Sequence, residues 1–209
     1  MTIDDAPGSK RLRLSGAERR ALILDVAARL FAAKGFHETS VGEIATAAGI
    51  SKIVLYDHFA SKEALFLELT RSARDGLLAR GQMRMAADGP LEERVRAAIE
   101  TFFSYVEEEP ARARILLIAP RGEPELRNLV ASIQDEATQG LMNLLMAEET
   151  LFRGESDRGA RLILIAEFIK SGLHGLAEWW VRHPDVPRDR LIATAMDVAW
   201  RGLGADGGR

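Results

Sequence analysis

Lys52 and Tyr56 lie four residues apart in the stretch SKIVLYDHF, so a helix through this stretch would present both side chains on one face. An ammonium group and a phenol side by side can hold the phosphates of a duplex, and Ile53 could contact a thymine methyl group. The other side chains that could leave the core face of this helix are Ser51, Asp57 and His58. The alternative is an ordinary solvated helix face on which Tyr56 is a core aromatic residue.

Patterns for catalysis or metal binding are weak by comparison. The histidines lack the H-E-x-x-H and E-x-x-H spacings of helical metal sites; they are His37, His58, His174 and His183. A G-x-G-x-x-G match at Gly202, Gly204 and Gly207 follows a helical pattern instead of a strand, so we interpret it as a frayed C-terminus. We therefore expect no enzyme activity, no metal site and no cofactor.

Two helix-start signals and a turn surround the candidate DNA-contacting residues. Ser40 and Glu43 have the spacing of a capping box, in which the serine accepts a free amide and the glutamate reaches back to the cap. The apolar stripe that follows stops at Gly49, which tolerates the left-handed conformation of a helix end, and Ser51 offers a second N-cap. This stripe consists of Val41, Ile44, Ala45 and Ala48. Residues 40–59 therefore have the proportions of a helix-turn-helix motif.

A supporting helix precedes this motif. Ser15 and Glu18 form another capping box, and the helix they open would end at Lys34 and Gly35, completing a three-helix head. Its expected core residues are Phe31, Phe36, Ile44, Leu55 and Phe59. Residues 1–14 are polar and carry Lys10, Arg11 and Arg13. They are either a disordered, solvated tail or a basic arm for the minor groove.

The stretch ETSVGEIATAAGISKIVLYDHFASKEALF resembles the N-terminal signature of the TetR family of bacterial one-component transcriptional repressors. The pattern L-Y-x-H-F-x-S-K-E-x-L is its specific part, whereas Ile53 and Asp57 stand at variable positions of the recognition helix. The resemblance implies phosphate contacts at helix N-termini and a recognition helix lined by the serine, lysine, tyrosine and histidine of SKIVLYDHF. The expected DNA-binding residues are Thr39, Ser40, Ser51, Lys52, Ile53, Tyr56, His58 and Lys62.

Composition agrees with an all-α protein. The 209 residues are 47% hydrophobic, and helix formers dominate over period-two runs of β-branched and aromatic residues. The absence of cysteine excludes disulfides, thiol nucleophiles and thiolate metal sites, and we expect a cytoplasmic protein. Residues 1–80 carry a net charge of +2 and the remainder carries −5, which suits a protein that contacts phosphate at one end.

Beyond the motif, the chain reads as long helices separated by glycine and proline. A helix over residues 61–80 would connect the head to a body. The body helices are expected at residues 90–108, 110–118, 124–148, 156–183 and 187–203. We predict a DNA-binding domain at residues 15–80 and a helical-bundle body for ligand binding and dimerisation at residues 81–209.

The body contains aromatic, methionine and polar residues that permit two interpretations. They form plain core, or they line the ligand pocket that the family resemblance implies. The candidate pocket residues are Phe102, Phe103, Met142, Met146, His174 and Trp179. Glu167, Lys170 and Ser171 interrupt the same apolar helix as His174; these four polar residues face solvent, line the pocket or cross a dimer interface.

The last two helices carry apolar stripes that could pair with the same faces of a second subunit. The candidate interface residues are Leu162, Ile165, Ile169, Leu173, Leu176, Trp180, Leu191, Ala195 and Val198. The alternative is that they only close the core of the monomer. A two-fold dimer is expected because one head reads too few bases for useful specificity.

These observations predict a homodimeric DNA-binding transcriptional regulator, a repressor that a small-molecule effector releases from double-stranded operator DNA. An enzyme built as a helical bundle is the first alternative, and it would need a local catalytic constellation that the sequence lacks. A helical adaptor that binds only protein is the second alternative. A binding assay with bare duplex DNA distinguishes the adaptor from the regulator.

Overall fold

The computed structural model describes residues 14–85, 89–117, 120 and 122–202. Within this part the chain forms nine helices and no strand, which confirms the predicted all-α class. The helices are α1 (Gly16–Lys34), α2 (Val41–Ala47), α3 (Lys52–His58), α4 (Lys62–Met85), α5 (Leu91–Glu108), α6 (Pro110–Leu117), α7 (Pro124–Met146), α8 (Arg158–Val181) and α9 (Arg188–Gly202). The expected basic tail, apart from Leu14, lies outside the described residues.

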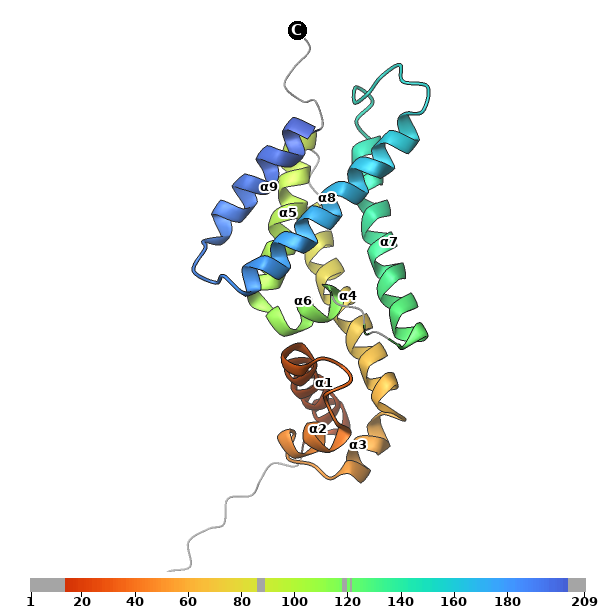
Figure 1. Cartoon of the computed structure of the whole chain (residues 1–209), viewed down its shortest axis with the longest axis vertical. Coiled ribbons are helices and arrows are strands. Elements are labelled where there is room, and N and C mark those ends of the chain that lie inside the picture. The colour runs from red at the N-terminus through yellow and green to blue at the C-terminus, as the bar shows by residue number, and fades with distance from the viewer. Residues whose placement is uncertain (1–13, 86–88, 118–119, 121, 203–209) are drawn as a thin grey trace, which may run out of the picture.

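The head consists of α1, α2 and α3, at the lower end of the molecule in Figure 1. Both predicted capping boxes are present, at Ser15 with Glu18 and at Ser40 with Glu43. Gly49 has a φ of +66°, a conformation that favours glycine, and this turn lets the chain leave α2 and enter α3. The head core is buried as expected, with Phe31, Phe36 and Phe66 meeting ring to ring.

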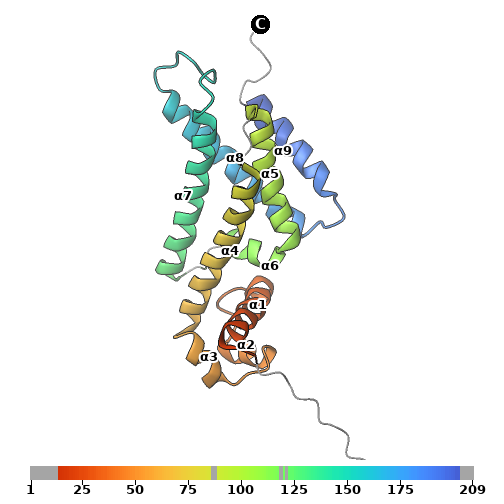
Figure 2. The ribbon, with the colours of Figure 1, turned by 180° about the vertical axis from the view of Figure 1, so that it is seen from behind.

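Helix α4 runs from the head into the body (Figures 1 and 2). Its first half, through Leu69, belongs to the hydrophobic core of the head, whereas Ala73 belongs to the core of the body. The two cores therefore divide inside α4, before the boundary at residue 80 that the sequence suggests. Ile115 of α6 and Leu126 of α7 also join the head core, so the body supports the head directly.

The body contains α5 to α9 together with the upper half of α4, on which α5, α6 and α7 pack (Figures 1 and 2). Its core is centred on fully buried aromatic and aliphatic residues such as Phe103, Tyr105, Leu145 and Leu162. Helix α5 packs between α4 and α9, and α8 packs along α7. Pro124 begins α7 as predicted, whereas Pro90 is the N-cap of α5 and not its first residue.

No helix in the described part of the chain is both long and apolar enough to cross a membrane.

Candidate nucleic-acid interface

The outer face of α3 carries exposed side chains at the tip of the head. Ile53 is 75% exposed and Tyr56 is 51% exposed, whereas Leu55 between them is fully buried. Tyr56 is therefore not a core aromatic residue. Lys52 is also exposed, so the face combines a cation, a phenol and a large apolar side chain. This is the set of groups that can contact phosphates and base edges together.

Lys52 lies close to the first turn of α2. A Cβ atom added at Gly42 would lie 2.8 Å from Cε and 3.2 Å from Nζ of Lys52, and 3.7 Å from Oγ of Ser40. Gly42 therefore leaves room for the lysine stem to fold over α2. The ammonium group and the exposed cap residue Ser40 lie in one neighbourhood, although they come from different helices.

Ser40 and Ser51 have the same local role at the starts of α2 and α3. The hydroxyl of Ser40 accepts a hydrogen bond from the amide of Glu43, and that of Ser51 accepts one from the amide of Val54, both at 3.2 Å. The ammonium group of Lys34 donates a hydrogen bond to the carboxylate of Glu43, and this bond is the main cause that lowers the pKa of Glu43 to about 2. The carboxylate of Glu43 in this capping box therefore stays ionised. Ser40 and Ser51 are both exposed at the surface of the head.

Two of the expected phosphate contacts have internal roles instead. Thr39 is fully buried, and its hydroxyl donates to the carbonyl oxygens of Gly35 at 2.8 Å and Leu30 at 3.3 Å. The ammonium group of Lys62 donates to the carbonyl oxygens of Phe36 at 2.9 Å and Thr39 at 3.2 Å. It also lies 4.3 Å from the centre of the Phe36 ring. The Thr39 hydroxyl thus ties the α1–α2 turn to the end of α1, and Lys62 joins that turn to α4. This corrects the expectation that the two side chains project toward DNA.

His58 ends α3 and is half-buried. Its carbonyl oxygen accepts a hydrogen bond of 2.6 Å from Arg20 of α1. The same guanidinium group pairs with Glu68 of α4 and lies 4.3 Å from the centre of the Phe59 ring. Arg20 therefore fixes the end of α3 against two other helices. Sequence reasoning missed it because no local spacing connects it to residues so far along the chain.

The body contains a cavity of about 370 Å³ between α4, α5, α7 and α8. Of the six pocket residues expected from the sequence, only Phe102 and His174 line it. Phe103 faces the core, where it meets Trp180 edge to face, because it lies about 100° further around α5. Met142 packs against the edge of the core, whereas Met146 and Trp179 are exposed. The expectation for these four residues is therefore corrected.

The polar residues within α8 form one connected group. Lys170, only 9% exposed, forms an ion pair of 2.8 Å with Glu167. Glu167 also accepts hydrogen bonds from Thr138 at 2.7 Å and Ser171 at 2.9 Å. The bonds from Lys170 and Thr138 are the main causes that lower the pKa of Glu167 to about 2. Glu167 and Ser171 lie toward solvent, whereas Lys170 and His174 line the cavity.

His174 lies in the cavity wall one helical turn after Lys170. Its ring stacks on Phe102, with centroids 5.5 Å apart and planes inclined at 23°. Burial, followed by the nearby charge of Lys170, lowers the pKa of His174 to about 4. The imidazole is therefore neutral at neutral pH.

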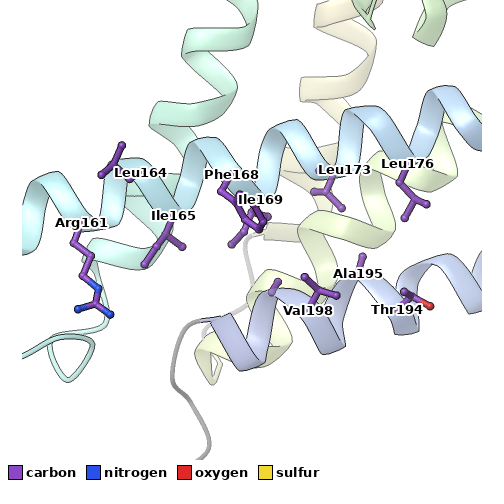
Figure 3. A pocket seen from close by; sticks show the side chains of 12 residues that line it. Arg161, Leu164, Ile165, Phe168, Ile169, Leu173, Leu176, Thr194, Ala195 and Val198 are labelled. Carbon is purple, nitrogen blue, oxygen red and sulfur yellow. The ribbon is translucent and has the colours of Figure 1, made fainter.

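An apolar groove of about 420 Å³ separates α8 and α9 (Figure 3). Six of the nine expected dimer residues line it, and they are Ile165, Ile169, Leu173, Leu176, Ala195 and Val198. Leu162, Trp180 and Leu191 are buried in the core of the monomer, so they do not form an accessible face. Leu164 and Phe168, which are not among the nine expected interface residues, line the groove and are 70% and 71% exposed.

Among the described residues, no group of three or more histidine or acidic side chains is placed to hold a metal ion.

Comparison with known proteins gives the head a family. The model of the family "Bacterial regulatory proteins, tetR family" matches residues 23–69. This range covers most of α1, all of α2 and α3, and the start of α4. It therefore contains the candidate interface described above.

Similarity to known regulators extends through the body. The chain is 28% identical over 200 residues to the HTH-type transcriptional activator FasR of Mycolicibacterium smegmatis, covering 95% of this chain and 89% of that protein. It is 35% identical over 161 residues to the HTH-type transcriptional regulator EthR of the same species, and the matched region covers 73% of this chain and 68% of that protein. A crystal structure of a TetR-like transcriptional regulator from Rhodococcus sp. RHA1 is 26% identical, with a TM-score of 0.78 over 92% of this chain and 99% of that chain. With this head, this body and these relatives, the chain belongs to the TetR family and is a DNA-binding transcriptional regulator.

Proposed function

We propose that this regulator is a two-fold dimeric repressor that binds operator DNA through α3 and is released by a small molecule bound in the body. The observation that carries the DNA-contact proposal is the exposed face of Lys52, Ile53 and Tyr56 on a helix whose opposite side is anchored by Leu55 and Phe59. A rigidly held helix with cationic, phenolic and apolar groups facing outward suits the major groove.

The contacts divide by chemistry. Lys52 and Ser40, which lie close together, would contact the phosphates of one strand, with Ser51 and Tyr56 beside them. Ile53 would contact base edges, since a large apolar side chain gains most from a thymine methyl group. His58 would lie at the end of this surface because it is half-buried at the C-terminus of α3. Thr39 and Lys62 support this surface from inside the head.

The α8–α9 groove is the proposed dimer interface. Phe168, Leu164 and Val198 expose large apolar side chains beside it, and such a continuous apolar face is costly in water. A second copy of the chain placed across a two-fold axis would cover both faces at once. The dimer would present two heads to a pseudo-palindromic operator.

The cavity beside α4 is the proposed effector site. Leu77, Leu78 and Gly81 of α4 line it, while Leu65 and Leu69 of the same helix belong to the head core. A ligand that favours one position of α4 would therefore change the placement of the head. It can shift DNA binding only by the difference between its affinities for the two arrangements.

Selection of bound sequences from random duplex DNA tests the DNA-binding proposal. Purified protein should enrich a pseudo-palindromic sequence, and sedimentation of the complex should give two protomers per site. A protein that enriches no duplex sequence would be better explained as an adaptor. Transcription in vitro from a promoter containing the enriched site then tests repression, and stimulation of that promoter would instead make this chain an activator, as FasR is named.

A further inference from the structure

The cavity between α4, α5, α7 and α8 has an almost wholly apolar lining. Leucine, isoleucine and valine side chains from all four helices form most of its wall, including Leu77, Ile99, Leu141 and Leu173. The polar exceptions are Arg74, Thr101, Glu136, Lys170 and His174. The chemistry of these few groups decides which apolar molecules the cavity accepts.

The charged groups of the lining are already neutralised by the protein. Lys170 pairs with Glu167 at 2.8 Å, and Glu167 is held in place by Thr138 and Ser171. Arg74 pairs with Glu136 at 2.6 Å and with Asp75 at 3.0 Å. An anionic ligand would have to compete with these carboxylates, and it would lose its own hydration on entry. A cationic ligand would meet the ammonium of Lys170 and the guanidinium of Arg74, and the carboxylate of Glu136 in the same lining is already paired with Arg74.

Hydrogen-bonding capacity that these ion pairs do not use remains on α8 and α5. An ammonium group has three donors, and one of those of Lys170 is directed to Glu167. His174 follows one turn later on α8, is a neutral imidazole at neutral pH, and stacks on Phe102. The hydroxyl of Thr101 donates to the carbonyl oxygen of Ala97 at 2.7 Å, which leaves its oxygen as an acceptor. A ligand oxygen can therefore be bound without bringing a charge into the cavity.

We infer that the cavity selects an uncharged aliphatic amphiphile, whose single carbonyl or hydroxyl oxygen meets Lys170 and His174 while its hydrocarbon part lies along α4, α5 and α7. This is the ligand class of the proposed effector site, and only the effect of the ligand on DNA binding rests on the proposed function. Binding itself can be measured without DNA.

A set of ten-carbon molecules with different head groups tests the selection. The probes are decan-2-one, decan-1-ol, decanoate and decylammonium, each titrated calorimetrically into full-length protein at pH 7.5. The ketone and the alcohol should bind, with decanoate and decylammonium at least about tenfold weaker. Decanoate or decylammonium binding as tightly as the ketone would overturn the inference, and so would the absence of binding by all four.

Two variants locate the binding. Lys170→Met keeps most of the side-chain volume and should weaken decan-2-one about tenfold because the oxygen loses a charged donor. Gly140 lines the cavity, and a Cβ added there meets no atom within 4 Å, so Gly140→Phe should be tolerated by the fold while its ring obstructs the cavity and weakens binding at least about tenfold. Gly159→Phe is the matched control, since its Cβ also meets open space but lies outside the cavity lining.

Equal affinity of Gly140→Phe and Gly159→Phe for decan-2-one would place the ligand elsewhere and overturn the inference. An unchanged affinity in Lys170→Met would overturn the assigned oxygen contact. If Lys170→Met does not fold, the glycine pair and the head-group series still decide the matter. Operator binding by the ligand-free protein is measured separately, so a failure of the DNA-binding proposal is distinguishable from a failure of this ligand assignment.

Discussion

The guanidinium group of Arg112 in α6 pairs with the carboxylate of Asp25 in α1, so a helix of the body holds the first helix of the head directly. Arg112 also donates to Ser72 of α4 at 3.0 Å and lies 3.6 Å from Glu109. One residue thus connects the body, the connecting helix and the head. This junction is a second route, beside α4 itself, by which a ligand in the body can affect α3.

Asp25→Ala should therefore reduce the coupling between effector binding and operator binding while lowering the unfolding free energy only slightly. The pair is half-exposed on the Asp25 side, so its loss should cost no more than about 1 kcal/mol of unfolding free energy. Effector-induced loss of DNA affinity, typically about 5 to 150-fold in such systems, should become several-fold smaller. Operator titrations with and without an effector found by thermal-shift screening measure this change. Glu92→Ala, which breaks an exposed ion pair with Arg96 within α5 and lies outside both the cavity lining and the α8–α9 groove, should leave the coupling intact.

Lys52→Ala should weaken operator binding and reduce its dependence on salt. Each phosphate contact contributes about −0.9 to the slope of log K against log salt, so the slope should become shallower by about one per protomer. Fluorescence anisotropy at several salt concentrations gives the slope. Arg153→Ala removes an exposed cation from the body and serves as the charge-matched control. Identical slopes for Lys52→Ala and Arg153→Ala would remove Lys52 from the interface.

Lys62→Met should lower the stability of the protein without changing the salt dependence of operator binding. Its ammonium group satisfies the carbonyl oxygens of Phe36 and Thr39, so its loss should lower the unfolding free energy by about 1 to 3 kcal/mol. The salt slope of operator binding should stay at the wild-type value because the side chain points into the head. Urea denaturation and the same anisotropy series measure both quantities. A shallower salt slope with an unchanged unfolding free energy would show that Lys62 contacts phosphate and does not support the head from inside.

Phe168→Glu should give a monomer that binds operator weakly. Phe168 is 71% exposed in the single chain, so the substitution leaves the monomer core intact but places a charge in the proposed interface. Analytical ultracentrifugation at micromolar concentration measures the oligomeric state. Val181→Glu alters another exposed apolar residue of α8 outside the groove and should remain dimeric. A dimer that survives Phe168→Glu would move the interface away from the α8–α9 groove.

His174 should make stability depend on pH below neutrality. Its pKa is lowered from 6.5 to about 4, mainly by burial, so the unfolded chain binds a proton at a pH where the folded chain does not. The stability contribution is complete above pH 6.5 and declines as the pH falls from 6.5 toward 4. The full loss is on the order of 3 kcal/mol. Urea unfolding at pH 7.5, 6 and 5 should show this decline in the wild type relative to His174→Gln, and parallel pH profiles would contradict it.

The sequence by itself determined the elements whose signals are local. The capping boxes at Ser15 and Ser40 each connect residues three positions apart, and Gly49 ends α2 through its own backbone conformation. Hydrogen bonds of this range form wherever the helix forms, so they can be read without knowing the rest of the fold. The alternation of Leu55 inside and Tyr56 outside follows from helix geometry once the motif is recognised.

Only the tertiary structure decided what the body surfaces do. Helix α8 is apolar around much of its circumference, so its sequence does not distinguish Leu162, buried against neighbouring helices, from Leu164 and Phe168, which remain exposed. In the same way, Phe102 stacks on His174 in the cavity wall whereas Phe103 meets Trp180 in the core, although the two rings are neighbours on α5 and both contact α8. Helices far along the chain decide which side of an apolar helix is covered. The spacing of apolar residues within one helix does not identify those distant helices.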